Sequence, residues 1–580
     1  MTFALLTALV ALAAPPSTLV REKPKPFADE GACSVDHFCW ENPLPVGVAL
    51  HTAWIVAPDD VWTAGDGGAL LHLVKERWQL EKKSPTTEKL TALWGSAPND
   101  LWAVGPGVAM HFDGKAWTVI PRTEGSELAG VWGASRDLVF LAGTKLQRFD
   151  GHDWKVLFED PRVKLLAVSG SGPKDVWAVG EETPDSGLPA HLVAVHFDGV
   201  AARKTGLPYP SSTATLAVGA PGEAWIGGER GLLLRLLGGA WKRVPSGSES
   251  ETVVVGGARK GLLAFVGGKG FFELSGGAPL KRFSSPGLSL RSLATGPDGS
   301  FCGVGDSTLV RFDGKSLHFE LRGSFGELRA IHGSSAKSVW AVGDKGLVLW
   351  RSDEGWMRLR AFTAASLRGV YADGTNVYVV GEDGAYRSNF DDFTRIALPA
   401  QVALGAVGGS GPDDVWITGA GGATFHFDGK GWSAIPTRTT LLLSSLAVVS
   451  PTDVWACGEG REAIHWDGKS WTTHQLPEAV SGIAVGERGA VFVSGGQQIW
   501  QWNGQKWLLS MKDAGTLTGL VRTGTGELLA FGEGHLLHEY NGVGWRRREL
   551  PPAGALRAGF SIGGTTWLVG SGAAILRRRQ

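Results

Sequence analysis

The sequence predicts an all-β protein assembled from about fourteen repeated units of four short strands, and three observations lead to that prediction. Glycine and tryptophan are frequent, at 84 and 25 of 580 residues, as is typical of many short strands joined by tight turns. One phrase, clearest at residues 90–121 (LTALWGSAPNDLWAVGPGVAMHFDGKAWTVIP), recurs along the chain. Its period is about 38 residues, the length of one four-stranded blade of a β-propeller.

The strands of residues 90–121 can be placed from the turns between them. We expect strands at Leu90–Trp94, Leu101–Val104, Val108–Phe112 and Ala116–Ile120. Pro98, Asn99 and Asp100 supply turn residues between the first two strands. Asp113-Gly114 between the last two favours a type I′ hairpin, which needs positive φ at both positions. The same signal recurs at Asp150-Gly151, Asp198-Gly199, Asp313-Gly314, Asp428-Gly429 and Asp467-Gly468, with Asn503-Gly504 and Asn541-Gly542 as variants.

A two-residue turn would fix the register of the third and fourth strands. It would place Phe112 opposite Lys115 and Met110 opposite Trp117. The second strand of most repeats carries one aromatic residue, which we interpret as blade packing rather than as a sugar-binding surface. These residues are Trp62, Trp102, Trp177, Trp225, Trp340, Trp416, Trp455 and Trp567.

Fourteen blades in one ring would leave a wide unfilled hole, so the sequence favours two seven-bladed rings, with six plus eight blades as the alternative. We expect the first propeller at residues 47–323 and the second at 324–580. The last repeat ends after three strands, whereas residues 37–46 resemble an unpaired fourth strand. We therefore expect this segment to close the fourteenth blade, because a paired edge is protected. The alternative is that each ring borrows a strand, with the boundary near Lys315.

The first residues of the chain resemble an export signal. Residues 1–14 combine an apolar run with a small-residue cleavage site, although no lysine or arginine precedes the run. An uncleaved anchor is the alternative, but the run is short for a bilayer. Residues 15–36 would form a linker. We therefore expect a periplasmic, surface or extracellular protein with no transmembrane segment in the mature chain.

The four cysteines fall into two groups. Cys33 and Cys39 lie close together after the leader and predict a local disulfide in an exported protein. A lipid-modified Cys33 is the alternative, but residues 29–32 do not supply the small apolar run that this needs. Cys302 and Cys457 lie within repeats and are expected in the core.

Composition argues against several ligand classes. Lys+Arg and Asp+Glu nearly cancel, at 56 and 57, so a nucleic-acid partner is not expected. Four histidines occupy one repeat position in different blades, which spreads them apart and argues against a metal site. Instead we expect each to make a blade-to-blade hydrogen bond with a loop aspartate. These are His111, His196, His426 and His465. No cofactor is expected.

Two departures from the repeat are the candidate binding residues. The first strand ends in Trp54, Trp94 and Trp132 in the first three units. Because this strand lines a propeller channel, the three would form an apolar or sugar-stacking ledge at the channel mouth; ordinary packing is the alternative. By spacing, the matching positions in the next four units are Ser169, Gly219, Gly256 and Thr295.

The second departure is a longer loop in the fourth unit. It carries Glu181, Glu182 and Asp185, and insertions in repeat proteins often lie on the binding face. A tolerated surface insertion is the alternative.

The DVWAVG and HFDGxxW phrases, with Cys39-Trp40-Glu41-Asn42-Pro43 near the start, resemble exported bacterial propeller-repeat proteins, similar in style to the sialidase-type (BNR, Asp-box) and YVTN/WD40-like groups. The resemblance implies a propeller fold and leaves the chemistry open. An Asp-box reads S-x-D-x-G-x-T-W, whereas the turn here reads D-G-x-x-W. A sialidase arginine triad and tyrosine nucleophile cannot be placed. The five tyrosines are Tyr209, Tyr371, Tyr378, Tyr386 and Tyr540.

These observations favour a non-enzymatic binding or scaffold protein that holds a protein or glycan partner on its propeller faces. The alternative is a carbohydrate-active hydrolase or lyase with its site in a propeller channel. That chemistry needs two carboxylates in one pocket, and no acidic pair departs from the repeat at adjacent channel positions.

Overall fold

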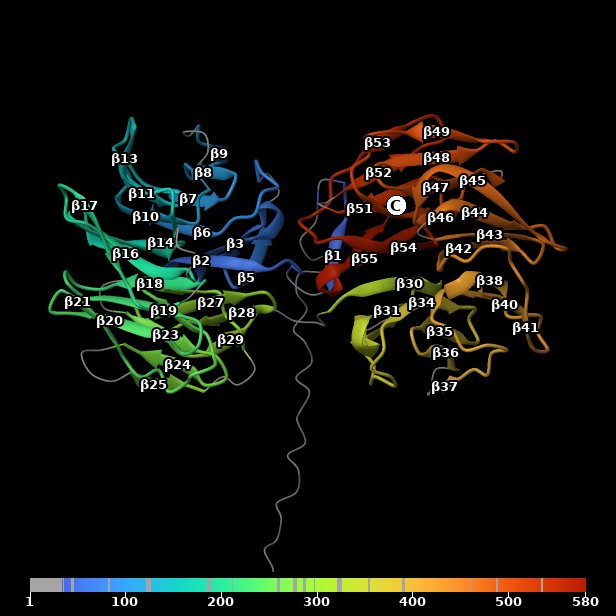
Figure 1. Cartoon of the computed structure of the whole chain (residues 1–580), viewed down its shortest axis with the longest axis horizontal. Helices are drawn as coiled ribbons and strands as arrows, with labels where there is room; N and C mark the ends of the chain where they lie inside the picture. Colours follow the sequence, from blue (N-terminus) through green and yellow to red (C-terminus); the bar gives the residue numbers. More distant parts are fainter. Residues whose placement is uncertain are drawn as a thin grey trace, which may run out of the picture.

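The computed structural model describes Ser34, residues 36–42 and residues 46–579, apart from gaps at 82–83, 122–126, 185–188, 211, 258–260, 275–278, 285–287, 297, 321–325, 353–354, 389–391, 459, 487–488 and 534–535. The described strands form fourteen four-stranded antiparallel sheets, arranged as two rings side by side (Figure 1). This confirms the all-β tandem propeller. No helix in these ranges is long and apolar enough to cross a membrane.

Ring 1 consists of seven blades in chain order. Its blades are β2–β5 (50–80), β6–β9 (92–119), β10–β13 (130–159), β14–β17 (163–206), β18–β21 (214–243), β22–β25 (253–283) and β26–β29 (292–319). The innermost strand of the first blade, β2 (Leu50–Ala57), contacts β26 (Ser292–Thr295) and β27 (Phe301–Gly305) of the seventh. Arg311 adds a hydrogen bond from its Nη1 to the carbonyl oxygen of Pro58, at 3.1 Å. The ring therefore closes after seven blades.

Ring 2 also has seven blades, but the last is assembled from both ends of the chain. Six blades are β30–β33 (328–358), β34–β37 (367–395), β38–β41 (404–434), β42–β45 (443–480), β46–β49 (482–511) and β50–β53 (517–547). The seventh contains β54 (Leu556–Ile562), β55 (Thr565–Gly570), β56 (Ile575–Arg579) and, outermost, β1 (Cys39–Asn42). β30 (Leu328–Ser335) contacts β54 and β55, which closes the ring. Four 3₁₀ turns follow second strands: η1 (Asp66–Gly68), η2 (Asp344–Gly346), η3 (Ala420–Gly422) and η5 (Ser571–Ala573).

β1 pairs antiparallel with β56, and Trp40 lies opposite Leu576. The side chain of Glu41 then joins the last blade to the first blade of ring 2. Its Oε2 accepts hydrogen bonds from Nε1 of Trp356 and of Trp567, each at 3.0 Å. Its Oε1 lies 2.9 Å from Nε of Arg577. Because Trp356 belongs to the first blade and Trp567 to the last, one carboxylate holds the two ends of the ring together.

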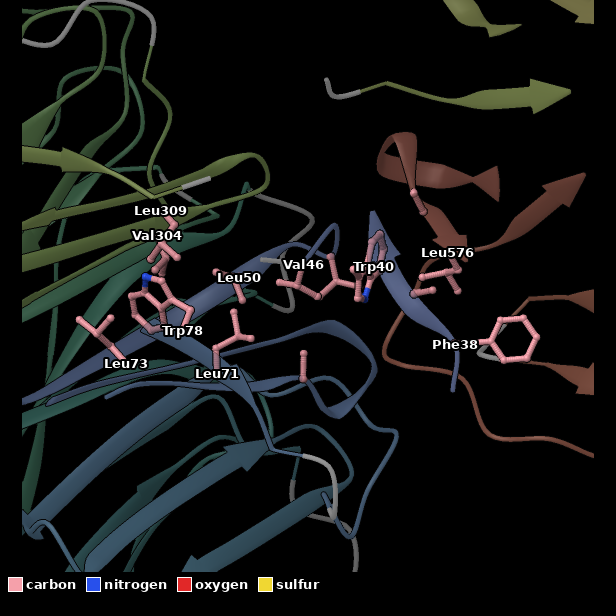
Figure 2. Packing of buried hydrophobic residues seen from close by; sticks show 14 of the residues in the cluster. Phe38, Trp40, Val46, Leu50, Leu71, Leu73, Trp78, Val304, Leu309 and Leu576 are labelled. Carbon is pink, nitrogen blue, oxygen red and sulfur yellow. The ribbon is translucent and has the colours of Figure 1, made fainter. Parts of the chain in front are cut away.

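The two rings share a hydrophobic cluster beside β1. Figure 2 shows Val46 between Trp40 of β1 and Leu50 of ring 1, with Phe38 and Leu576 on the far side of β1. Phe38, Trp40, Val46 and Leu50 are at most 1% exposed. The chain thus enters ring 2, crosses to build ring 1, and returns to ring 2 through 320–327, part of which lies outside the described residues. The predicted boundary between the two propellers, at residues 323–324, falls within that gap.

The register predicted for the third and fourth strands is wrong by two residues. Phe112 lies opposite Trp117 and Met110 opposite Val119, so the connection contains four residues. The cause is the side chain of Asp113, whose Oδ1 accepts hydrogen bonds from the backbone N–H groups of Lys115 (2.8 Å) and Ala116 (2.9 Å). Such Asx turns compete with the two-residue hairpin. The same bonds form at Asp150, Asp198, Asp313, Asp428, Asp467, Asn503 and Asn541.

The aromatic residues of the second strands lie between blades. Trp225, Trp340, Trp416 and Trp567 are at most 1% exposed, which agrees with a packing role. Cys302 and Cys457 are buried free thiols. Cys39 is disulfide-bonded, and its predicted partner Cys33 lies outside the described residues.

We predict that Glu41→Gln loosens ring 2 selectively. The substitution removes the carboxylate charge that faces the guanidinium group of Arg577, which is only 10% exposed, and breaking a buried pair of this kind destabilises by about 3 kcal/mol. Hydrogen exchange followed by mass spectrometry should show faster exchange in β54–β56 and in β30–β33, with ring 1 unchanged. Glu76→Gln, at an exposed turn of ring 1, is the matched control. Equal exchange in the two variants would contradict the role given to Glu41.

A second prediction concerns acid stability. Glu539 is fully buried and accepts hydrogen bonds from Arg546 (3.0 Å), Arg548 (2.6 Å) and Arg578 (2.8 Å). Burial alone raises the pKa of Glu539, but the three guanidinium groups outweigh it and lower that pKa to about 2. The stabilisation is therefore complete above pH 4.5, the ordinary pKa, and is lost as the pH falls towards 2.

Glu539→Gln should remove that part of the pH dependence. Urea unfolding of the variant, followed between pH 6 and pH 2.5, should give a flatter stability profile than the parent protein. Identical profiles would rule out Glu539 as the titrating group.

Candidate functional site

The channel of ring 1 brings together the three tryptophans singled out by the repeat. A cavity of about 290 Å³ is lined by the innermost strands of all seven blades and includes Trp54, Trp94 and Trp132. Trp54 is on β2, Trp94 on β6 (Ala92–Ala97) and Trp132 on β10 (Gly130–Ser135). Trp94 is 6% exposed, whereas the other two are only partly buried. The site therefore presents two accessible indoles around a buried one.

Strand register identifies the equivalent positions in the other blades. Trp94 lies opposite Trp102 on the neighbouring strand, and the same pairing selects one residue in each remaining blade. Those residues are Ser169, Ala217, Val255 and Ala294. The assignment of Gly219, Gly256 and Thr295 from spacing is therefore wrong, because the blades differ in loop length. The conclusion that aromatic residues occupy this position in only three of the seven blades of ring 1 is unchanged.

Each of the three indoles rests on a glycine of the next blade. A Cβ atom at Gly95 would lie 3.0 Å from Nε1 of Trp54, and one at Gly170 would lie 2.7 Å from Cη2 of Trp132. A Cβ atom at Gly133 would overlap the ring of Trp94. Trp54 and Trp94 also contact each other, with ring centroids 6.2 Å apart and tilted by 53°. The glycines thus allow the indoles to overlap the neighbouring blade, so these residues pack the structure as well as line the channel.

The channel cavity is nearly uncharged. Among the described lining residues, the ionisable ones are His51 and Arg291. Nε2 of His51 donates to Asp66 at 2.7 Å, and Nε of Arg291 donates to Asp306 at 2.6 Å. Burial raises the pKa of Asp66, but the hydrogen bond and the charge of His51 outweigh it and leave that pKa below its ordinary value. Each of these two side chains is therefore already paired with an aspartate that does not line the cavity.

The other predicted binding residues lie elsewhere. Glu181 and Glu182 are the last two residues of strand β15 (Asp175–Glu182). They lie at the end of the strand away from the hairpin that joins it to the preceding strand. Glu182 accepts a hydrogen bond from Nζ of Lys204 at 2.9 Å, next to Asp160, which accepts from the same nitrogen at 2.7 Å. Glu182 therefore serves an ion-pair network of its own blade. Asp185 lies outside the described residues.

The repeated histidines bond within their own blade, not between blades as expected. Nε2 of His426 donates to Oδ1 of Asp414 at 2.8 Å, and the imidazole stacks on Trp416 at 4.2 Å between centroids. The same carboxylate accepts from Nε1 of Trp416 and from Ser410. Equivalent Asp–His pairs are Asp60–His72, Asp100–His111, Asp175–His196 and Asp453–His465. We call this arrangement the Asp–His unit.

Each aspartate of an Asp–His unit opens a second strand, so the repeated D of the DVW phrase is explained by structure. Within the described ranges, no three His, Cys, Asp or Glu side chains gather in a way that could hold a metal ion.

Ring 2 has an aromatic group that sequence spacing did not reveal. His332 lies between Tyr371 and Phe560, with ring centroids 4.9 and 4.6 Å away. These residues come from three consecutive blades and occupy the strand position of Trp94, opposite Trp340, Tyr378 and Trp567 respectively. Burial lowers the pKa of His332 to about 4, which keeps the ring neutral at pH 7. Only the strand register, not the repeat spacing, could have identified this group.

The sequence matches no protein-family model, and no curated protein matches it. Among solved structures it is similar to PorZ, described as a bacterial surface component of the type-IX secretion system of Porphyromonas gingivalis. The identity is 12%, over 92% of this chain and 86% of PorZ, with a TM-score of 0.62. Weaker likenesses are YCF48 from Cyanidioschyzon merolae (18% identity, 44% of this chain, 96% of that chain, TM-score 0.39) and the extracellular domain of BT3049 from B. thetaiotaomicron (9%, 92%, 81%, TM-score 0.37). At these identities, the likeness to PorZ shows the propeller fold alone.

We predict that Gly133→Ala displaces the indole of Trp94. The added methyl group has no room beside the ring, and overpacking of this kind destabilises by about 1–3 kcal/mol. Near-ultraviolet circular dichroism should change, and ring 1 should unfold at lower urea. Gly172→Ala is the control, because nothing lies within 4 Å of a Cβ atom there. Indistinguishable spectra and stabilities for the two variants would refute the stacking arrangement.

Proposed function

We propose that this chain is an exported, non-enzymatic binding protein and that ring 1 receives its partner at the channel mouth lined by Trp54, Trp94 and Trp132. The observation that carries the proposal is the 290 Å³ cavity, in which two partly exposed indoles flank a buried one. Apolar cavities bordered by aromatic residues are the usual form of a small binding site. The partner is a protein side chain or a glycan ring that presents a flat apolar face.

A carbohydrate-active hydrolase or lyase is the less favoured function. Glycoside hydrolysis uses two carboxyl groups that flank the scissile bond. Arg291 and His51 are the ionisable groups among the described lining residues, and each is paired with an aspartate. A binding site fits this lining better than a catalytic one.

Export is proposed from the sequence of the first fourteen residues, and two observations support it. Cys39 is disulfide-bonded, as is common in oxidising compartments. PorZ, which shares the fold over most of the chain, is a bacterial surface component. In the proposed organisation, residues 1–14 are a cleaved leader, residues 15–36 a linker and residues 37–46 the strand that serves ring 2. The two propellers then occupy 47–323 and 324–580.

Replacement of both exposed indoles tests the channel-mouth proposal. Three proteins would be applied to an array of bacterial glycans and purified envelope proteins. They are the parent protein, the double variant Trp54→Ala/Trp132→Ala and the control Trp466→Ala, which lies in the outer part of ring 2. The parent and control should bind the same probe, and the double variant should bind it about tenfold more weakly or worse, because aromatic anchors dominate binding energy.

Far-ultraviolet circular dichroism must show that all three proteins are folded. Equal binding by the folded double variant would sink the proposal. Loss of binding in the control alone would move the site to ring 2.

A further inference from the structure

Nine of the fourteen described blades lack the Asp–His unit, and these nine include two neighbours in ring 2. At its two polar positions, the blade β46–β49 carries Ala490 and Gln501, and Gln501 lies opposite Phe492. The next blade, β50–β53, carries Glu527 and Glu539, of which Glu539 is committed to the three arginines described above. Glu527 therefore has no histidine partner. Of the polar side chains at these positions, Glu539 is satisfied by arginines, whereas Gln501 and Glu527 are paired neither with each other nor with a histidine.

A cavity of about 870 Å³ lies between the same two blades. One side is formed by Gln501, Trp502 and Asn503, at the end of strand β48 (Gln498–Trp502). The other side is formed by residues from the facing hairpins of the next blade, including Glu527, Tyr540 and Asn541. Phe492 and Leu528, each 1% exposed, also line it.

The lining of this groove offers unused hydrogen-bonding groups. Oδ1 of Asn503 accepts from the backbone of Gln505 and Lys506, and Oδ1 of Asn541 accepts from Val543 and Gly544, so each amide keeps its NH₂ group for a ligand. In the described part of the chain, the side-chain amide of Gln501 and the indole N–H of Trp502, which both line the groove, have no hydrogen-bond partner.

Glu527 contributes an acceptor. Its Oε2 accepts only from Thr525 at 3.2 Å, and no cation pairs with it within the described ranges. The groove thus offers both donors and acceptors next to the rings of Trp502 and Tyr540.

We propose that this groove, between blades β46–β49 and β50–β53, is a binding site for an uncharged oligosaccharide. Sugar hydroxyl groups both donate and accept, as the carboxamide and carboxylate groups of the lining require. Aromatic rings supply the apolar surface that a pyranose face covers. Glu527, the charged side chain among the described lining residues, would repel an anionic sugar. The volume lies within the range of about 300–1,000 Å³ that is usual for ligand pockets.

The full-length protein would be titrated with neutral oligosaccharides, namely cellohexaose, maltohexaose and chitohexaose, and with a library of uncharged hexapeptides. Calorimetry and saturation-transfer NMR would detect binding. At least one oligosaccharide should bind, and Gln501→Ala and Glu527→Gln should each weaken it about tenfold or more. Gln505→Ala is the matched control, because this exposed residue of the same hairpin does not line the groove. The double variant Trp54→Ala/Trp132→Ala should bind as the parent does, which separates this site from the channel of ring 1.

Three results would overturn the proposal. They are the absence of oligosaccharide binding up to millimolar concentration, binding that survives both Gln501→Ala and Glu527→Gln, and binding of peptides in place of sugars. The unfolding temperatures of the variants would be measured first and should match that of the parent. In the described part of the chain, the side chains of Gln501 and Glu527 make no hydrogen bond other than the one from Thr525 to Glu527.

Discussion

Closure of ring 2 depends on a short strand from the opposite end of the chain. β1 covers the outer edge of β56, and Glu41 bonds the first and last blades through the indoles of Trp356 and Trp567. Ring 1 has no such strand and closes by packing of β2 against β26, helped by Arg311. The chain runs from β1 directly into ring 1. β1 therefore lies in the hydrophobic cluster that the two rings share.

In the five Asp–His units, the aspartate and the histidine satisfy each other within one blade, and this restricts where function can reside. Asp414 meets Ser410, Trp416 and His426 in one blade, which leaves no free group for chemistry. The positions that depart from this pattern are therefore the informative ones. Trp54 and Trp132 line one channel, and Gln501 and Glu527 line one groove. Among the described lining residues, the channel has no carboxylate and the groove has one, that of Glu527.

Much of the fold could be predicted from the sequence, because the same turn residues recur in successive repeats. The Trp and Asp-Gly signatures led to four strands per blade and to fourteen blades, as observed. The register of the outer hairpins was wrong because Asp113 bonds to the backbone of Lys115 and Ala116, an option that the dipeptide alone does not reveal. The positions at Ala217, Val255 and Ala294 were missed because loop lengths drift between blades.

The candidate sites were less predictable. The proximity of Trp54, Trp94 and Trp132 could be predicted from their shared strand position. Their packing against glycines of the next blade could not. The groove at Gln501 could not be found, since it depends on partners that are missing from two adjacent blades.

The role of β1 is tested most directly by removing it. Hydrogen exchange would be compared between the full chain and a chain that begins at residue 46. The amides of β55 and β56 should exchange at least about tenfold faster in the shortened chain, as expected for an uncovered sheet edge, while those of ring 1 blades distant from β1 keep their protection. Unchanged protection of β56 would contradict the dependence of ring 2 on its borrowed strand.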